Sequence, residues 1–248
     1  MGTQEEVREP RGLEPRAEAG SAGREPSAIE DVRPAYYALA RGGWRDYVTL
    51  LHPPYTLWHL SYVAVGAAIA PVFHLDRMLW SLAAFFLAMG VAAHALDELH
   101  GRPLRTQIPS KVLVALAAVG LAGACAIGIG SAAAWGWGLL VFVAIGAVIV
   151  PAYNLELALH TDWGFALCWG VFPVLTAYFV EAQTIRVEAV AAAAYAFALS
   201  LAQRALSTPV RAARREHQTV DATLERALRL LVWAATLLAV ALVAFRLG

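Results

Sequence analysis

The sequence is short of charged residues and of cysteine. Charged residues occupy 15% of its 248 positions and hydrophobic residues 59%, whereas a soluble domain has about 25% and about 45–50%. This balance excludes an ordinary soluble domain and favours a chain dissolved in lipid. The net charge is +0, so we expect no nucleic-acid partner. Cys125 and Cys168 lie in apolar runs, where we expect two small core residues and no disulfide.

The first 35 residues lack aromatic side chains and contain few β-branched ones. They are rich in Glu, Arg, Pro and Gly, and such a segment cannot bury enough apolar surface to offset the entropy lost on ordering. We therefore predict a disordered tail over residues 1–35. The next stretch, residues 36–54 (YYALARGGWRDYVTLLHPP), mixes aromatic residues with arginine, which predicts a helix lying in the membrane interface.

Long apolar runs fill the remainder of the chain, residues 55–248. A helix needs about 20 mostly apolar residues to cross a hydrocarbon layer about 30 Å thick. Seven runs of this kind lie near residues 55–73, 78–97, 111–131, 133–152, 163–181, 187–206 and 228–246. We therefore predict an all-α fold, a polytopic bundle of about seven transmembrane helices in a lipid bilayer.

Basic residues are distributed unevenly between the predicted loops, and Lys111 is the only lysine. The loop after the second run carries Arg102, Arg105 and Lys111, and Arg41 and Arg45 precede the first run. The loop after the sixth run carries Arg204, Arg211, Arg214 and Arg215, with Arg226 and Arg229 before the last run. The loops after the first, third and fifth runs carry only Arg77 and Arg186. Cytoplasmic loops of membrane proteins are enriched in Lys and Arg. The pattern predicts an integral protein of the cytoplasmic membrane with its N-terminus in the cytoplasm.

Ionisable residues at membrane depth are costly and usually mark functional sites or structural pairs. His94, Asp97 and Glu98 close the second run at spacings i, i+3 and i+4, which predicts that they share one helix face. Polar residues also follow the fourth run and close the sixth, and the predicted topology puts all three groups at one end of the bundle. We predict a single polar site there, with His94, Asp97 and Glu98 as its catalytic residues.

Two metal chemistries suit these residue types. The oxygens of Asp97 and Glu98 can hold Mg²⁺ when a phosphate supplies further ligands. Imidazole and carboxylate groups together suit a transition metal. His94 and Glu98 are four residues apart, and so are Glu156 and His160. In a helix, each pair would lie on one face. The full alternative ligand set is His59, His94, Glu98, Glu156 and His160.

Three stretches resemble the UbiA-type membrane prenyltransferases, and the resemblance runs from about residue 50 to 246. LHPPYTLWHLSYVAVGAAIAP (51–71) is similar to the family's first helix. GRPLRTQIPSKVLVALAAVGLAGA (101–124) is similar to the loop after its first aspartate motif, and PAYNLELALHTDWGFALCWGVFPVLTAYFV (151–180) to the segment joining its fourth and fifth helices. The resemblance implies that carboxylates bind Mg²⁺, that Mg²⁺ holds an isoprenyl diphosphate, and that an acceptor attacks the allylic cation formed on ionisation.

The resemblance places residues 94–98 at the family's first motif, with His94 where Asn is usual. The second acidic motif would close the sixth run, but no acidic residue lies between Glu188 and Glu216. Arginine binds phosphate oxygens bidentately. Either the diphosphate is held directly by Arg204, Arg211, Arg214 and Arg215, with one metal at Asp97 and Glu98, or the chemistry differs from that of the family. The substrate-binding residues that we predict are Arg102, Tyr153, Asn154, Gln203, Arg204 and Arg211.

Two other functions stay open at the level of sequence. One is a non-enzymatic lipid-binding or scaffold protein that keeps the fold and lacks the second acidic motif. The other is a membrane enzyme that depends on a metal held by the His and carboxylate set. The first function predicts that substitutions at residues 94–98 lower the stability of the protein, with no enzymatic turnover to affect. The second function predicts a stoichiometric bound metal.

Overall fold

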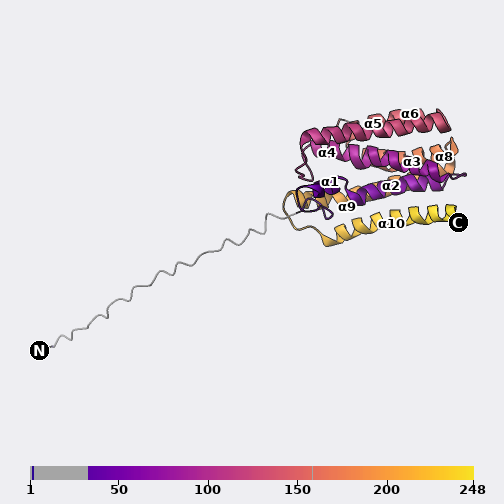
Figure 1. The fold of residues 1–248 in the computed structure, drawn as a ribbon. Helices are drawn as coiled ribbons and strands as arrows, with labels where there is room; N and C mark the ends of the chain where they lie inside the picture. The colour runs from indigo at the N-terminus through magenta and orange to yellow at the C-terminus, as the bar shows by residue number, and fades with distance from the viewer. Residues whose placement is uncertain (1, 3–32, 158) are drawn as a thin grey trace. The chain divides into compact units, whose positions relative to one another are not determined.

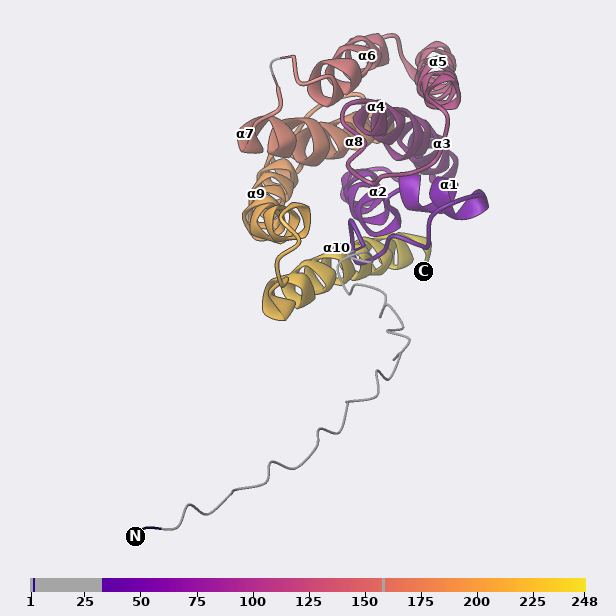
Figure 2. The ribbon, with the colours of Figure 1, turned by 90° about the vertical axis from the view of Figure 1, so that its left-hand side faces the viewer.

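The computed structural model describes residues 2, 33–157 and 159–248 of the chain. The predicted disordered tail therefore lies outside the described residues, except for Gly2 and residues 33–35. The described part is helical and contains no strand, which confirms the all-α prediction. Figure 1 shows its helices running side by side, and Figure 2 views the same bundle end-on, with α5, α6, α9 and α10 around α2 and α4.

The helices follow one another with short connections. Their bounds are α1 Trp44–Leu50, α2 Pro53–Ala68, α3 Leu75–Phe85, η1 Phe86–Ala93, α4 His94–Leu99, α5 Ser110–Trp135, α6 Leu139–Asn154, α7 Asp162–Phe165, η2 Ala166–Val171, α8 Phe172–Ala182, α9 Val187–Arg215 and α10 Ala222–Leu247. The segments η1 and η2 are π-helical and lie inside continuous helices. Each of the seven predicted apolar runs is therefore helical over most of its length.

Five of these continuous helices are long and apolar enough to cross a membrane. They span Leu75–Leu99, Ser110–Trp135, Asp162–Ala182, Val187–Arg215 and Ala222–Leu247. Helices α2 and α6 have 16 residues each, or about 24 Å at 1.5 Å per residue. The outer faces are apolar at mid-helix, since Val119, Val148 and Leu237 are 71%, 63% and 61% exposed. Such faces are suited to contact with lipid.

Two predicted boundaries differ in the structure. The break expected between residues 131 and 133 is helical, and α5 continues to Trp135. The turn follows at Gly136, whose φ of +149° disfavours any residue with a Cβ. The interfacial helix expected over residues 36–54 is restricted to α1, Trp44–Leu50. Gly43 precedes it at φ +63°, so a glycine at its first end limits the helix to two turns.

Helix α2 lies at the centre of the packing and contacts α3, α8, α9 and α10. Trp58 and Tyr62 on α2 are 1% exposed and join one buried cluster with Val174 of α8. The two helices approach closely at Gly66, where an added Cβ would lie 2.3 Å from the Val174 carbonyl oxygen. Small residues permit such backbone contact, which is how helices associate in a solvent as apolar as their own side chains.

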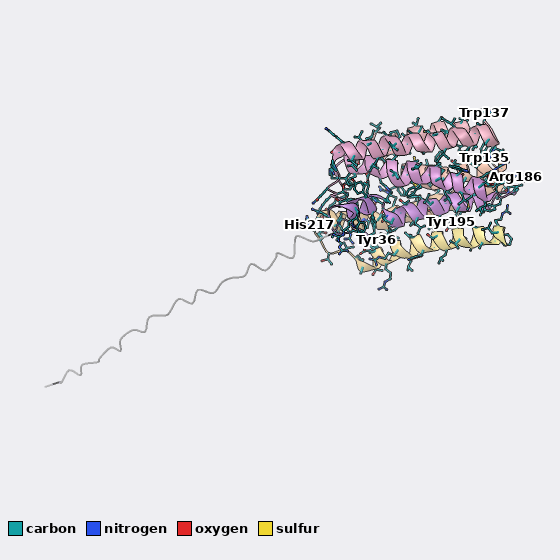
Figure 3. The ribbon with its side chains drawn as sticks, in the orientation of Figure 1. Tyr36, Trp135, Trp137, Arg186, Tyr195 and His217 are labelled. Atoms are coloured by element: carbon teal, nitrogen blue, oxygen red, sulfur yellow. The ribbon has the colours of Figure 1, made fainter. Side chains whose placement is uncertain are left out.

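The two ends of the bundle differ in chemistry. Figure 3 places Tyr36 and His217 at one end, and Trp135, Trp137 and Arg186 at the other. The end with Tyr36 collects the first turn of α2, the last turns of α4, α6 and α9, and the first turn of α10. The polar residues singled out in the sequence lie in or near this end of the helices, so the element order brings them to one end.

Candidate functional site

A cavity of about 220 Å³ lies at the end of the bundle that carries Tyr36. Its walls come from α2, η1, α4, α6, α7, η2, α9 and α10, from the loop between α4 and α5, and from residues 34–37. Nine of the predicted site residues line it: His59, His94, Asp97, Tyr153, Asn154, His160, Gln203, Arg204 and Arg211. Glu98, Arg102 and Glu156 are not among its lining residues. Three polar groups far apart in sequence thus meet in one chamber.

Asp97 and Glu98 point in different directions, although the sequence predicts a shared face. Successive residues of an α-helix are rotated by about 100°, so these neighbours diverge while His94 lies between them. Asp97 and His94 face the cavity. Glu98 is fully buried on the opposite flank, where both of its carboxyl oxygens accept hydrogen bonds from the loop that follows. Glu98 therefore does not share the cavity face with His94 and Asp97.

Glu98 shapes the loop between α4 and α5, which supplies one wall of the cavity. Its Oε2 accepts from the Leu104 amide at 2.9 Å, and its Oε1 accepts from the Thr106 amide at 2.8 Å and the Thr106 hydroxyl at 2.9 Å. Asp46 of α1 accepts from the Gln107 amide at 2.7 Å. These bonds hold Pro103, Leu104 and Arg105 against the cavity.

Arg102 belongs to the same loop and not to the ligand wall. Its guanidinium donates to the carbonyl oxygens of Thr106 and Ile108 at 3.1 and 2.7 Å and to the Ser110 hydroxyl at 3.0 Å. Arg102 itself has a φ of +51°. Arg102, which the sequence predicts to bind substrate, is not among the lining residues of the cavity, and its donors bond within the loop and to Ser110. Arg105, three residues later, is the loop arginine that lines the cavity.

A stacked histidine pair forms another part of the wall. The rings of His52 and His94 lie 4.1 Å apart at an angle of 17°. His52 has left-handed backbone angles (φ 45°, ψ 57°) directly before Pro53, a conformation that costs about 1–3 kcal/mol for a non-glycine residue. The Tyr37 hydroxyl and His52 Nδ1 are 2.7 Å apart. Burial raises the pKa of Tyr37 far above its usual value, so the hydroxyl keeps its proton and donates to the imidazole.

His59 reaches the cavity from α2. Its Nδ1 lies 2.9 Å from the carbonyl oxygen of Trp169, in the π-helical segment η2. Segment η1 precedes His94 and contributes Met89 and Ala93 to the wall. Single π-turns inside α-helices are frequent at functional sites, because the wider turn displaces side chains and carbonyl groups from the regular register. Both π-segments of the described chain border this cavity.

The turn after α6 supplies an aromatic and imidazole face. Tyr153 stacks on His160 with ring centroids 4.8 Å apart, and the Asn154 amide donates to the Val150 carbonyl at 2.7 Å. Glu156 lies outside, with its carboxylate 3.6 Å from His100 Nε2 and 3.8 Å from His160 Nε2. His100 and Glu156 are both half exposed, so this is a surface contact of the turn.

Helix α9 provides the positive charge. Arg204 forms an ion pair with Asp162 at 2.7 Å and lies 5.5 Å from the centre of the Phe165 ring. Arg211 lines the cavity at its exposed mouth, together with Arg214 and Arg215 one turn on. Gln203 is 5% exposed, and its Oε1 is buried without a hydrogen-bond partner among the described residues. Five arginines line the cavity when Arg105 is counted, against the single carboxylate of Asp97 among the described lining residues.

The side chains that line the cavity fit only one of the predicted metal sites. Among the described residues, no group of three or more His, Cys, Asp or Glu side chains is placed to hold a metal ion. The alternative set is not assembled, because Glu98 holds the loop and Glu156 lies outside the cavity. A two-carboxylate site at Asp97 and Glu98 does not fit either. Mg²⁺ held by Asp97 and by phosphate oxygens of a ligand does fit the residues, since Mg²⁺ commonly binds through one or two carboxylates plus phosphates.

An apolar groove of about 100 Å³ adjoins the cavity. It is lined from α3, η1, α5, α6, η2 and α8, with Ala88, Leu121 and Phe172 among its residues. Met89 and Trp169 line both the groove and the cavity. A polar chamber and an apolar groove therefore share one wall, and that wall includes a flexible methionine.

Sequence reasoning missed the aromatic side of the cavity. Tyr36, Tyr37 and Tyr55 line it together with His52, but the sequence assigned residues 36–54 to an interfacial helix alone. The available signal was the histidine directly before Pro53, since a residue preceding proline is restricted in conformation. The side chains that the segment places against the bundle depend on the turn at residues 39–43, which periodicity does not reveal.

The stability of this region depends on pH through His52. Burial lowers the pKa of His52 well below its usual value, and the neighbouring His94 and Arg211 lower it further. The unfolded chain takes up a proton near pH 6.5, which folded His52 does not. Stability is therefore complete above about pH 6.5 and falls as the pH decreases, by about 2 kcal/mol for this group at pH 5.

Thermal unfolding of the detergent-solubilised protein at pH 7.5 and 5.0, followed by tryptophan fluorescence, measures this effect. His52→Asn keeps a polar side chain without a titrating group in this pH range, so the drop between the two pH values is expected to shrink. An equal drop in the variant and the wild type would contradict the assignment to His52.

No protein-family model, curated protein or solved structure matches the chain.

Proposed function

We propose that the protein is an integral membrane transferase of the UbiA type, which moves an isoprenyl group from a diphosphate to an acceptor. The observation that carries this proposal is the shared wall between an arginine-rich cavity and an apolar groove, formed by Met89 and Trp169. An isoprenyl diphosphate has a strongly anionic head and an apolar tail. The arginine-rich cavity matches the anionic head in charge, and the apolar groove matches the tail in polarity. The two adjoin each other as the head and tail do.

The head group is assigned to the side of the cavity formed by α9. Arg204 and Arg211 are seven residues apart on α9, about two helical turns, and therefore lie on the same helix face. Both can contact one anion. Guanidinium groups bind phosphate oxygens through paired hydrogen bonds. The tail is assigned to the groove beside η1, where Ala88 and Gly146 leave space between α6 and the bundle. Substrate would reach the groove from the lipid side.

The chain's own residues supply most of the proposed chemistry. The C–O bond between the isoprenyl carbon and the diphosphate breaks, and the arginines stabilise the negative charge that develops on the leaving group. The aromatic faces of Tyr153, Phe165 and Trp169 stand beside the chamber and stabilise an adjacent carbocation through cation–π interaction. The acceptor forms the new bond and gives up one proton. Asp97 would hold Mg²⁺, which adds positive charge at the diphosphate when bound.

The proposed membrane topology has seven spans, with α2 and α6 crossing in addition to the five longer helices. Both are apolar and continuous with the bundle but are about 24 Å long, so the bilayer would thin beside them or their ends would be covered by loops. Arg102 and Arg105 lie in the loop between α4 and α5 at the cavity end, and Lys111 lies in the first turn of α5. The bias of basic residues toward cytoplasmic loops assigns this end, and the N-terminus, to the cytoplasm.

The test uses the full chain in lipid nanodiscs with a radiolabelled isoprenyl diphosphate. Arg211→Gln removes a charge from the cavity mouth and is expected to weaken binding about tenfold, because one charge-assisted hydrogen bond contributes about 1.5–3 kcal/mol. Arg186→Gln, at the opposite end of the bundle (Figure 3), removes the same charge and is expected to leave binding unchanged. Equal affinity for wild type and Arg211→Gln would contradict the proposed head-group site.

A non-enzymatic lipid-binding role is favoured by one observation, the use of Glu98 in the loop, which leaves Asp97 as the lone cavity carboxylate among the described residues. The same nanodisc sample separates the two roles. A transferase releases pyrophosphate when Mg²⁺ and an acceptor are added, and Asp97→Asn abolishes the release. A binding protein retains the diphosphate intact and shows the same Arg211 dependence.

A further inference from the structure

Residues 33–39 form a strap across the end of the bundle. They lie before α1 and contain no helix, and Pro34, Ala35, Tyr36 and Tyr37 line the cavity. The other described segments of similar length that border the cavity belong to helices, to the loop held by Glu98 or to the turn after α6. The strap therefore covers part of the chamber without the support of regular backbone hydrogen bonding.

Besides the Tyr37 ring, which packs against Tyr55 of α2 at 5.8 Å between centroids, three contacts attach residues 33–37 to the bundle. Arg214 of α9 donates to the carbonyl oxygen of Arg33 at 2.8 Å. The Arg229 guanidinium of α10 lies 4.6 Å from the centre of the Tyr36 ring, a cation–π distance. The Tyr37 hydroxyl donates to His52. Two of these three contacts are made by arginines from the helices α9 and α10.

Both arginines are held by one carboxylate. Glu225 of α10 lies 3.1 Å from Arg214 and 3.2 Å from Arg229. The Arg214 and Glu225 side chains are 13% and 16% exposed, so their ion pair is screened less than a surface pair. Glu225 does not touch the strap itself. It orients the two groups that do.

The strap is anchored firmly at its other end. Ala38 is 1% exposed, and the Leu39 amide donates to the Thr49 hydroxyl of α1 at 3.0 Å. Gly42 and Gly43 follow with φ of +101° and +63°, so the chain turns into α1 on residues of low steric restriction. Residues 33–37 can thus leave the cavity while residues 38 and 39 stay in place.

We propose that the strap is a lid over the end of the cavity, and that Glu225 holds it shut through Arg214 and Arg229. The lid opens to widen the access of a polar ligand from water and closes to narrow that access. This inference rests on the proposed function only where it identifies that ligand as an anion. Arg214 also lines the cavity, so the group that fastens the strap is the one that an anion in the chamber would contact.

The test measures access to the cavity wall and does not depend on turnover. In the full chain with Cys125→Ala and Cys168→Ala, the substitution Ser207→Cys places a thiol on α9, at a cavity-lining position that is 1% exposed. The rate of its modification by a small water-soluble methanethiosulfonate reports opening of the lid. We expect Glu225→Gln to raise this rate about tenfold, because both arginines lose the carboxylate that orients them.

Two further variants keep the test decisive. Tyr36→Ala removes one contact from the strap itself, leaves the helices untouched and is expected to raise the rate as well. Asp76→Asn removes one acidic charge at the exposed start of α3, at the other end of the bundle, and should leave the rate unchanged. The lid proposal is overturned if Glu225→Gln and Tyr36→Ala both label at the wild-type rate while their thermal unfolding is unaltered.

Inorganic pyrophosphate separates this inference from the proposed function. Faster labelling of Glu225→Gln together with slower labelling of the wild type in the presence of pyrophosphate supports both, because an anion then occupies the chamber behind the strap. Faster labelling of Glu225→Gln with no protection by pyrophosphate supports the lid and contradicts the anion site. Equal labelling of all variants with clear protection by pyrophosphate overturns the lid and supports the anion site.

Discussion

Glu98→Ala is expected to lower the free energy of unfolding by about 3 kcal/mol or more. The carboxyl group receives three hydrogen bonds, from the amides of Leu104 and Thr106 and from the Thr106 hydroxyl. Leu104 and Thr106 are 5% and 6% exposed, so water does not readily replace the lost acceptor. Each buried donor left without a partner costs about 1–3 kcal/mol. The loop that forms one wall of the cavity should lose its shape.

The neighbouring acid provides a matched control for this substitution. Asp97 faces the cavity and is not part of the loop's hydrogen bonding, so Asp97→Ala is expected to change the stability by less than about 1 kcal/mol. Thermal unfolding in detergent and hydrogen exchange of residues 100–109 measure both variants. Equal losses in the two variants, or unchanged exchange of the loop in Glu98→Ala, would refute the structural role of Glu98.

Gly66→Ala is expected to destabilise the bundle by about 3 kcal/mol. The added Cβ would lie 2.3 Å from the carbonyl oxygen of Val174, and 3.0 Å from its carbonyl carbon. These are backbone atoms, which cannot move aside without shifting α8 against α2. Overpacking of a tight contact costs about 1–3 kcal/mol even when side chains can adjust. Here the contact is with backbone atoms, so no side chain can adjust to relieve it. The cost exceeds the gain of about 1 kcal/mol from the better helix propensity of alanine.

Gly130→Ala tests the same chemical change where space is open. Gly130 lies in α5, and nothing lies within 4 Å of a Cβ added there. This variant should therefore be neutral or up to about 1 kcal/mol more stable. The two proteins are compared by their thermal midpoints in one detergent. A Gly66→Ala protein as stable as Gly130→Ala would show that α2 and α8 do not pack as closely as described.

The fold class follows from the sequence because hydrophobic runs are local. Residues 111–131 and 187–206 are apolar over the length that a spanning helix needs, and α5 and α9 occupy these positions. Helix ends were less well predicted. Gly130 lies inside α5 while Gly136 ends it. Gly136 has a φ of +149°, and a Cβ added there would meet the Gln183 side chain. The sequence displays neither property.

The candidate site was predictable in part for the same reason. Apolar runs of similar length return the chain to the same end at residues 94, 153 and 203, so polar residues there were expected to meet. The sequence could not tell Asp97 from Glu98, since both are acids at the end of one helix. It also gave no sign that Arg102 would bind loop carbonyls while Arg105 would line the cavity.

The sequence by itself determined that this chain is helical, that its helices are apolar enough for lipid, and that its ionisable residues gather at one end. These properties depend on composition and on the spacing of residues within one helix, which local chemistry controls. The tertiary structure decided which acid faces the cavity, which arginines surround it, and that residues 33–39 lie across it. Those outcomes depend on the rotation of one helix against its neighbours and on hydrogen bonds between distant segments, and no local pattern encodes either.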